Sequence, residues 1–134
     1  MRLYLNFVLL LSKNYTTAPK MIIKNRTRNR ALHESSEFCE DVFSKFTGLM
    51  FSLDKNRSLT FKFGRERIIS LHMFFVFYPI DVLFLDKNKV VVDMKENFRP
   101  FAFYSSKRKA MYAIELPAGV IKKSKTEIGD KIGF

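Results

Sequence analysis

Short segments in which apolar and polar residues alternate dominate the hydrophobic pattern of this chain. Residues 59–63 place Leu and Phe at every second position, as in a strand with one buried face. Residues 110–116 alternate in a similar way. Met21–Lys24 and Ala31–His33 are predicted as short strands around the basic turn Asn25–Asn29. The pattern therefore predicts several short strands joined by tight connections.

The longest apolar stretch runs from Ile68 to Leu85. Its 18 residues approach the length of a membrane helix, but it includes His72, Pro79 and Asp81, and β-branched and aromatic residues dominate it. Proline cannot donate a hydrogen bond to a strand ladder. We therefore predict two buried strands that meet at Pro79.

Helical signals are few. Acidic residues in 34–41 precede a helically spaced apolar pattern over 42–50, which predicts a helix there. A second helical turn is predicted from Pro117 to Lys125. The polar residues 86–89 lead into Val90–Met94, as in a hairpin. The predicted fold class is mainly β (a β-rich α+β domain): a compact antiparallel sandwich or open barrel with one or two short helices.

Composition adds limits to this picture. The chain has 134 residues, 47% of them hydrophobic, which suits one globular domain. A single cysteine, Cys39, rules out an internal disulfide and a cysteine-based zinc site. The formal net charge is +11, but from residue 34 onward the chain carries only +4. The excess charge is thus concentrated in the first quarter of the sequence.

The first 20 residues differ from the rest. An apolar run of about nine residues follows Arg2, which is too short to span a bilayer but has the length of a signal-peptide core. We expect residues 1–20 to be an extension outside the domain, through an upstream start codon or as a signal-like segment, and residues 21–134 to form the single domain. A start at Met21 predicts a cytoplasmic protein; a working signal segment predicts an exported or membrane-associated one.

Three blocks together carry a family resemblance. They are Gly48-Leu49-Met50-Phe51, the segment from Pro79 to Asp86, and the segment from Ile114 to Gly119 with Gly129-Asp130 beyond it. In this order they resemble the archaeal and bacterial family called domain of unknown function 192, over roughly residues 21–134. His72-Met73 makes the chain similar to archaeal members. The resemblance implies a compact β-rich domain and no reaction, ligand or catalytic set.

Three residues are candidates for acid/base chemistry: His72, Asp81 and Glu115. Asp81 shares a strand face with apolar residues, where an acid needs hydrogen bonds or a raised pKa. It is either a site carboxylate or an acceptor of backbone N–H groups at a bulge, and the second is favoured. His72 is favoured as a hydrogen-bonded core residue over a titrating group. Glu115 points opposite to its apolar neighbours, where it pairs with Arg99 or Lys95 or serves a site.

Neither a metal nor a cofactor is predicted. His33 and Glu37 stand four residues apart, one helical turn, but no third ligand accompanies them. Cys39 is interpreted as a packed residue. The glycines lie away from any phosphate-loop pattern, so we predict no cofactor.

Anion binding has two candidate segments. One is the basic turn at 24–30; the other is a hydroxyl-rich basic loop whose candidates are Arg99, Ser105, Lys107, Arg108 and Lys109. The alternative for such a loop is a solvated turn. Nucleic acid is not favoured, because Phe61-Lys62-Phe63 has the pattern of core phenylalanines with an exposed lysine, and the only other mixed segment is 98–101.

The sequence therefore favours a non-enzymatic module that binds a small ligand or a protein. The alternatives are an acid/base enzyme using Asp81 and Glu115, and a basic domain that binds anions or nucleic acid. No transmembrane span is predicted, and the sequence does not determine the oligomeric state.

Overall fold

The computed structural model describes residues 19–40, 54–74 and 76–134. The helix expected over 42–50 and the first 18 residues lie outside these ranges. The described part contains nine strands and one short helix, so the prediction of a mainly β fold is confirmed. Among the described residues, no helix combines the length and apolar character that crossing a membrane requires.

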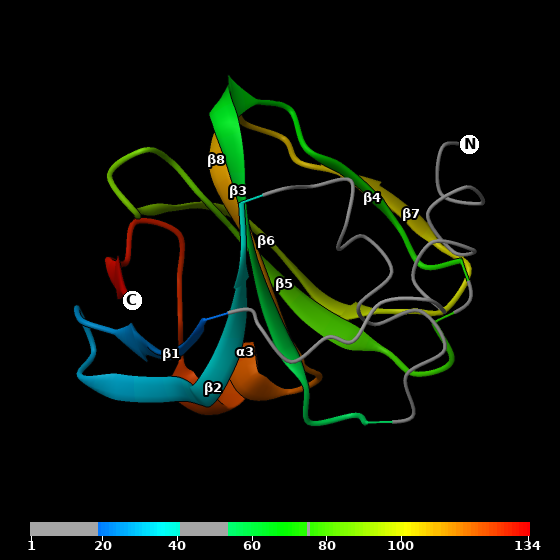
Figure 1. Cartoon of the computed structure of the whole chain (residues 1–134), viewed down its shortest axis with the longest axis horizontal. Helices are drawn as coiled ribbons and strands as arrows, with labels where there is room; N and C mark the ends of the chain where they lie inside the picture. Colours follow the sequence, from blue (N-terminus) through cyan, green and yellow to red (C-terminus); the bar gives the residue numbers. More distant parts are fainter. Residues whose placement is uncertain (1–18, 41–53, 75) are drawn as a thin grey trace.

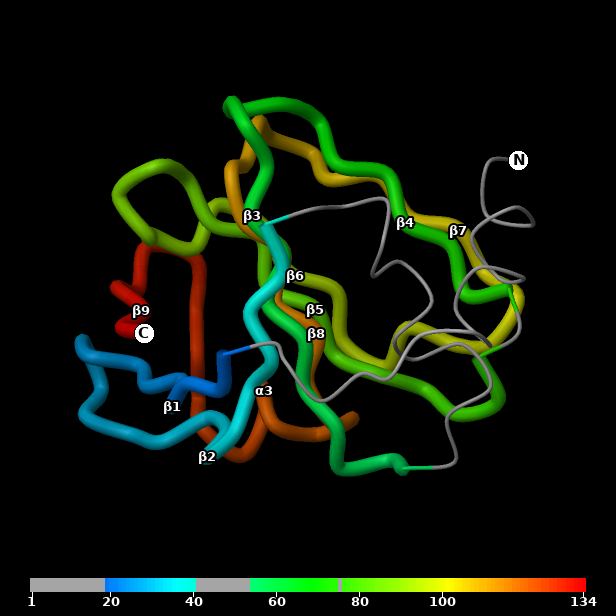
Figure 2. The backbone as a smooth tube through the Cα atoms, viewed as in Figure 1, coloured from blue at the N-terminus to red at the C-terminus, as the bar shows by residue number. Residues whose placement is uncertain are grey.

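Seven strands form one sheet in the order β6-β5-β8-β3-β2-β1-β9. Their bounds are β1 Lys20–Asn25, β2 Arg30–Cys39, β3 Ser58–Arg67, β5 Ile80–Leu85, β6 Val91–Phe98, β8 Ala110–Pro117 and β9 Ile132–Gly133. An isolated bridge between Val90 and Lys131 brings the β9 end of the sheet back to the start of β6. The sheet is thus curled, as expected for an open barrel, and the C-terminal end lies beside β1 (Figure 2).

One pair of strands, β2 and β3, is parallel. The strand predicted at Ala31–His33 is longer than expected, because β2 continues to Cys39. Ser36 and Glu37 face Ser58 and Leu59 of β3, and this long-range pairing extends the strand through a segment with weak local strand signals. β3 extends past the alternating residues 59–63 and continues through Gly64 to Arg67.

Two further strands, β4 (Ser70–His72) and β7 (Phe103–Ser105), pair only with each other among the described residues. They lie beside the curled sheet (Figure 1). We call this pair the β4–β7 ribbon. Leu71 and Met73 are buried and Tyr104 is partly buried, all packed against Phe61, Val82 and Phe84 of the main sheet. The ribbon therefore covers one face of β3, β5 and β8.

The opposite face of these strands has its own apolar core. It contains Leu83, Leu85 and Ile114 of the sheet together with Ile23 of β1 and Ile121 of α3 (Val120–Ser124). Two cores on opposite faces mean that neighbouring residues of β5 and β8 enter different environments, because successive side chains of a strand point to opposite faces. This alternation decides how the candidate residues are placed.

Candidate functional site

Asp81 is buried on the α3 face of β5, with Leu116 of β8 directly opposite. Its Oδ1 accepts a hydrogen bond from the N–H of Asn97 at 3.0 Å. Its Oδ2 accepts from the N–H groups of Gly119 and Ile121 at 3.0 and 2.9 Å. These are donors at the end of β6 and at the first turn of α3, where helix N–H groups have no partner within the helix. The carboxylate therefore ties β5, β6 and α3 together at a β-bulge.

Glu115 lies on the other face of the sheet. It stands opposite Val82 and Leu59, which belong to the core beneath the β4–β7 ribbon. The side chain is partly buried, and burial raises its pKa to about 8, against a smaller lowering by the charge of Arg57. Arg57 itself donates two hydrogen bonds to the carboxylate of Glu37, at 3.2 and 2.9 Å. Glu115 thus points away from Ile114 and Leu116, as predicted, but into a partly buried setting near Arg57.

His72 occupies an outward position on the β4–β7 ribbon, opposite Phe103. Its Nδ1 accepts a hydrogen bond from the N–H of Phe74 at 3.3 Å, and its Nε2 is buried without a partner in the described part of the chain. Burial lowers the pKa of the imidazole. The three acid/base candidates are therefore distributed over a ribbon and two opposite sheet faces, and Asp81 and Glu115 do not face a common cavity.

His33 and Glu37, four residues apart, do not have the spacing of one helical turn. His33 and Glu37 lie on a strand, so four residues separate them by roughly 13 Å rather than by one helical turn. His33 Nε2 contacts the carbonyl of Asn56, and Glu37 pairs with Arg57. No group of three or more His, Cys, Asp or Glu side chains suited to a metal occurs among the described residues. Cys39 is buried in the core, as interpreted.

The basic loop after β7 is anchored by a buried acid that the sequence analysis did not single out. Asp93 Oδ2 accepts hydrogen bonds from the hydroxyl of Tyr104 and the N–H of Lys107, both at 2.8 Å. Burial and the bond to Asp93 raise the pKa of Tyr104 to about 12. The Ser105 hydroxyl bonds to Ser70. The charged side chains of the predicted anion loop are exposed: Arg99, Lys107, Arg108 and Lys109.

A second buried acid, Asp130 in the segment before β9, holds the basic turn after β1. Asp130 accepts hydrogen bonds from Asn25 at 2.9 Å and from Arg28 at 2.7 Å. Burial alone raises the pKa of Asp130, but these bonds and one from the N–H of Glu127 outweigh it and lower the pKa. Arg28 also pairs with Glu127 at 2.6 Å. Arg28 is therefore paired with two acids of the C-terminal segment.

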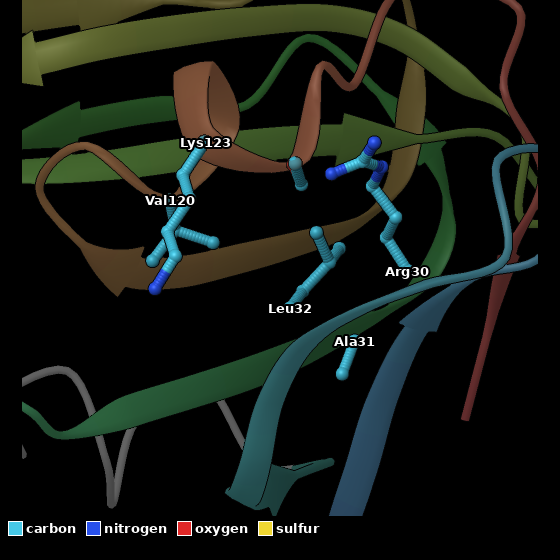
Figure 3. A pocket seen from close by; sticks show the side chains of 6 residues that line it. Arg30, Ala31, Leu32, Val120 and Lys123 are labelled. Carbon is cyan, nitrogen blue, oxygen red and sulfur yellow. The ribbon is translucent and has the colours of Figure 1, made fainter.

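A pocket of about 310 Å³ opens between β2 and α3. Arg30, Ala31, Leu32, Val120, Lys123 and Ser124 line it. Figure 3 shows the Arg30 side chain reaching from β2 towards α3, and the Lys123 side chain extending from α3. Arg30 and Lys123 are exposed, and no carboxylate of the described residues forms an ion pair with either. The Ser124 hydroxyl already forms hydrogen bonds with the Ile121 carbonyl and the Thr126 hydroxyl. The pocket therefore offers two cations and an apolar wall.

Arg30 falls in the basic turn that the sequence singled out, whereas Lys123 and the apolar wall were missed. Leu32 and Val120 are separated by 87 intervening residues, and nothing local indicates that they meet. Only the packing of α3 against β2 brings the two segments together.

Comparison with known proteins gives one consistent family. Residues 23–134 match the profile of domain of unknown function 192, described as "Uncharacterized ACR". A UPF0127 protein of Thermococcus sibiricus is 40% identical over 112 residues, which cover 82% of this chain and 72% of that protein. A UPF0127 protein of Pyrococcus furiosus is 36% identical over 110 residues, or 81% of this chain and 93% of that protein.

Two crystal structures share the fold. A Sinorhizobium meliloti protein, described as a proposed transcription regulator, superposes with a TM-score of 0.76 at 24% identity, over 90% of this chain and 97% of its own. A Novosphingobium aromaticivorans protein of unknown function has a TM-score of 0.77 at 18% identity, over 91% of this chain and 90% of its own. These likenesses extend the curled, β-rich architecture to bacteria.

Proposed function

The chain belongs to the family called domain of unknown function 192, and we propose that its domain is a non-enzymatic module that binds a small organic anion. The site is the pocket between β2 and α3. The observation that carries the proposal is the pair of cations, Arg30 and Lys123, placed around an apolar wall without acidic partners in the described chain.

The chemistry of the lining defines the ligand class. A guanidinium and an ammonium group favour a carboxylate or a phosphate ester, and the planar guanidinium suits two-point hydrogen bonding. Leu32, Val120 and Ala31 would contact an apolar body. A volume of about 310 Å³ lies at the lower end of the range for ligand sites, roughly 300–1,000 Å³. The ligand is therefore a small anion with an apolar portion.

The placement of the acidic candidates supports binding over acid/base catalysis. An enzyme using Asp81 and Glu115 would need both carboxylates within reach of one substrate. Asp81 faces the α3 core with three backbone N–H donors, and Glu115 faces the core beneath the β4–β7 ribbon. The two cations of the pocket, by contrast, line the same cavity.

The proposal predicts that small apolar anions stabilise the purified full chain. Phenyl phosphate, benzoate and hexanoate serve as probes in thermal unfolding, with benzyl alcohol and hexanamide as neutral counterparts. A ligand at ten times its Kd adds about 1.4 kcal/mol to the free energy of unfolding. Loss of a charge-assisted hydrogen bond costs about 1.5–3 kcal/mol, so Arg30→Gln with Lys123→Gln is expected to weaken binding by about tenfold or more.

Lys122→Gln is the matched control, because Lys122 is exposed on the same helix but does not line the pocket. It should change the Kd less than twofold, as calorimetry would measure. Equal stabilisation by anions and their neutral counterparts would contradict the proposal. So would a loss of binding in Lys122→Gln as large as in the double variant.

A further inference from the structure

Exposed aromatic rings occur on the outer face of the β4–β7 ribbon and in the turn that precedes β7. Phe103 is 69% exposed, Phe101 is 56% exposed and Phe74 is 37% exposed. The rings of Phe74 and Phe103 meet edge to face with centroids 5.1 Å apart, and the His72 ring lies 4.9 Å from that of Phe74. These contacts hold the rings together at the surface. The cluster is separate from the pocket between β2 and α3.

The arrangement follows from strand alternation. Leu71 and Tyr104 form one cross-strand pair and face the core, so the next pair, His72 and Phe103, faces outward. The register of the ribbon therefore places Phe103 on its exposed side. Replacing Phe103 removes apolar surface that does not contact the core.

The exposed charges of the ribbon segments are basic, and the acid that contacts the ribbon, Asp93, is buried. The two segments that build the ribbon and its flanks, 67–80 and 97–110, contain five Arg and Lys residues and no acid. All five side chains are exposed: Arg67, Arg99, Lys107, Arg108 and Lys109. Arg99 precedes the turn to Phe101, and Lys107 follows the other end of β7. Cations thus stand at both ends of the aromatic cluster.

We infer that this face of the ribbon binds single-stranded nucleic acid. Exposed aromatic rings can stack on unpaired bases, and flanking cations can contact the phosphates. Of the two mixed segments noted in the sequence, Phe61 and Phe63 are buried, as interpreted. The second differs: Phe98 is buried, but Phe101 is exposed beside Arg99. Together with Phe103 it gives the aromatic and basic surface that the sequence alone did not indicate.

An anionic membrane is the main competing partner for an aromatic and basic surface. Within residues 19–40, 54–74 and 76–134 the ribbon has two strands, so no described strand pairs with the backbone N–H and C=O groups along its outer edges. Such groups are costly to bury in lipid, where nothing satisfies them. The phosphates and sugars of a nucleic acid can accept or donate these hydrogen bonds. The polar edges therefore favour nucleic acid.

The test is fluorescence anisotropy of the full chain with labelled dT20 and rU20 at 50 and 200 mM salt. Three to five phosphate contacts predict a loss of affinity of about 20- to 100-fold over that range. Phe103→Ala is expected to weaken binding at least about fivefold, since stacking of one base contributes about 1–3 kcal/mol. Arg99→Gln should reduce the salt dependence.

Ile128→Ala is the matched control for Phe103→Ala, because Ile128 is 60% exposed and lies between α3 and β9, away from the ribbon. It should bind dT20 as the unmodified chain does. The double variant in the pocket, Arg30→Gln with Lys123→Gln, should still bind dT20. Adding Phe103→Ala to it should weaken that binding by the same factor as in the unmodified chain. Circular dichroism confirms that each variant is folded.

Three results would overturn the inference. One is no binding of dT20 or rU20 at 50 mM salt. Another is binding that Phe103→Ala and Ile128→Ala affect equally, which would mean that the single strand binds by electrostatic attraction without stacking on Phe103. The third is a Phe103-dependent association with phosphatidylserine-containing vesicles in place of the single strands, which would assign the surface to a membrane.

Discussion

Asp81→Ala is expected to lower the free energy of unfolding by about 4 kcal/mol, a large part of the 5–15 kcal/mol typical of a native protein. The change leaves three N–H donors, those of Asn97, Gly119 and Ile121, without their acceptor. Each unpaired buried donor costs about 1–3 kcal/mol. Guanidinium unfolding at pH 7 measures the loss, and hydrogen exchange at Gly119 and Ile121 locates it.

Asp81→Asn keeps the shape of the side chain but changes its hydrogen-bonding capacity, so it measures the contribution of the hydrogen bonds alone. Its amide has one acceptor oxygen in place of two, so at least one of the three donors then faces an NH₂ group. We expect a loss of about 2 kcal/mol. Asp86→Asn is the control, because both bonds that Asp86 accepts from Asn88 and Val90 go to one oxygen, which an amide retains. It should cost less than about 0.5 kcal/mol.

The outcome also bears on the role of Asp81. A carboxylate that serves to hold backbone donors stabilises the fold, whereas active-site groups are commonly retained at a cost in stability. If Asp81→Asn were as stable as the unmodified chain or more so, the structural role would fail. The acid/base hypothesis would then gain support.

The hydrophobic pattern of the sequence predicts most of the strands, and β5 and β8 show why. β5 is buried on both faces and β8 is buried over most of its length, so their apolar residues predict strands irrespective of their partners. Asp81 was detectable because a polar residue interrupts such a strand. The sequence favours a role for it as an acceptor of backbone N–H groups, since a buried acid needs donors.

The site could not be predicted to the same extent, because it depends on which strands meet. The parallel pairing of β2 with β3 brings Glu37 opposite Leu59 and next to Arg57. Sequence reasoning expected Arg99 or Lys95 beside Glu115, whereas the charge that acts on it is that of Arg57. Similarly, Arg30 and Lys123 share a pocket only because α3 packs on β2. Contacts this distant in sequence leave no periodic signal.

The second large effect concerns Glu115, whose pKa is raised from 4.5 to about 8 in the folded chain. Below pH 4.5 the side chain keeps its proton in both states and has no net effect on the pH dependence. As the pH rises from 4.5 to 8, the unfolded chain releases that proton while the folded chain retains it. Unfolding becomes progressively easier over this window, and the effect levels off above pH 8.

Glu115→Gln removes this dependence. Each pKa unit corresponds to about 1.4 kcal/mol, and allowing for partial solvent screening we expect the variant to be about 2–4 kcal/mol more stable at pH 9. The two proteins should be nearly equal at pH 4.5. Guanidinium unfolding at half-unit pH intervals gives the difference curve, from which contributions common to both proteins cancel.

Glu96→Gln, which changes an exposed carboxylate on β6, is the control and should leave the pH profile close to that of the unmodified chain. A stability difference for Glu115→Gln that stays constant from pH 4.5 to 9 would mean that Glu115 ionises alike in both states. The partly buried setting beside Arg57 would then be more open to solvent than its position between Leu59 and Val82 indicates. A difference that keeps growing from pH 4.5 to about pH 8 would instead identify Glu115 as a protonated carboxylic acid at neutral pH, able to donate a hydrogen bond.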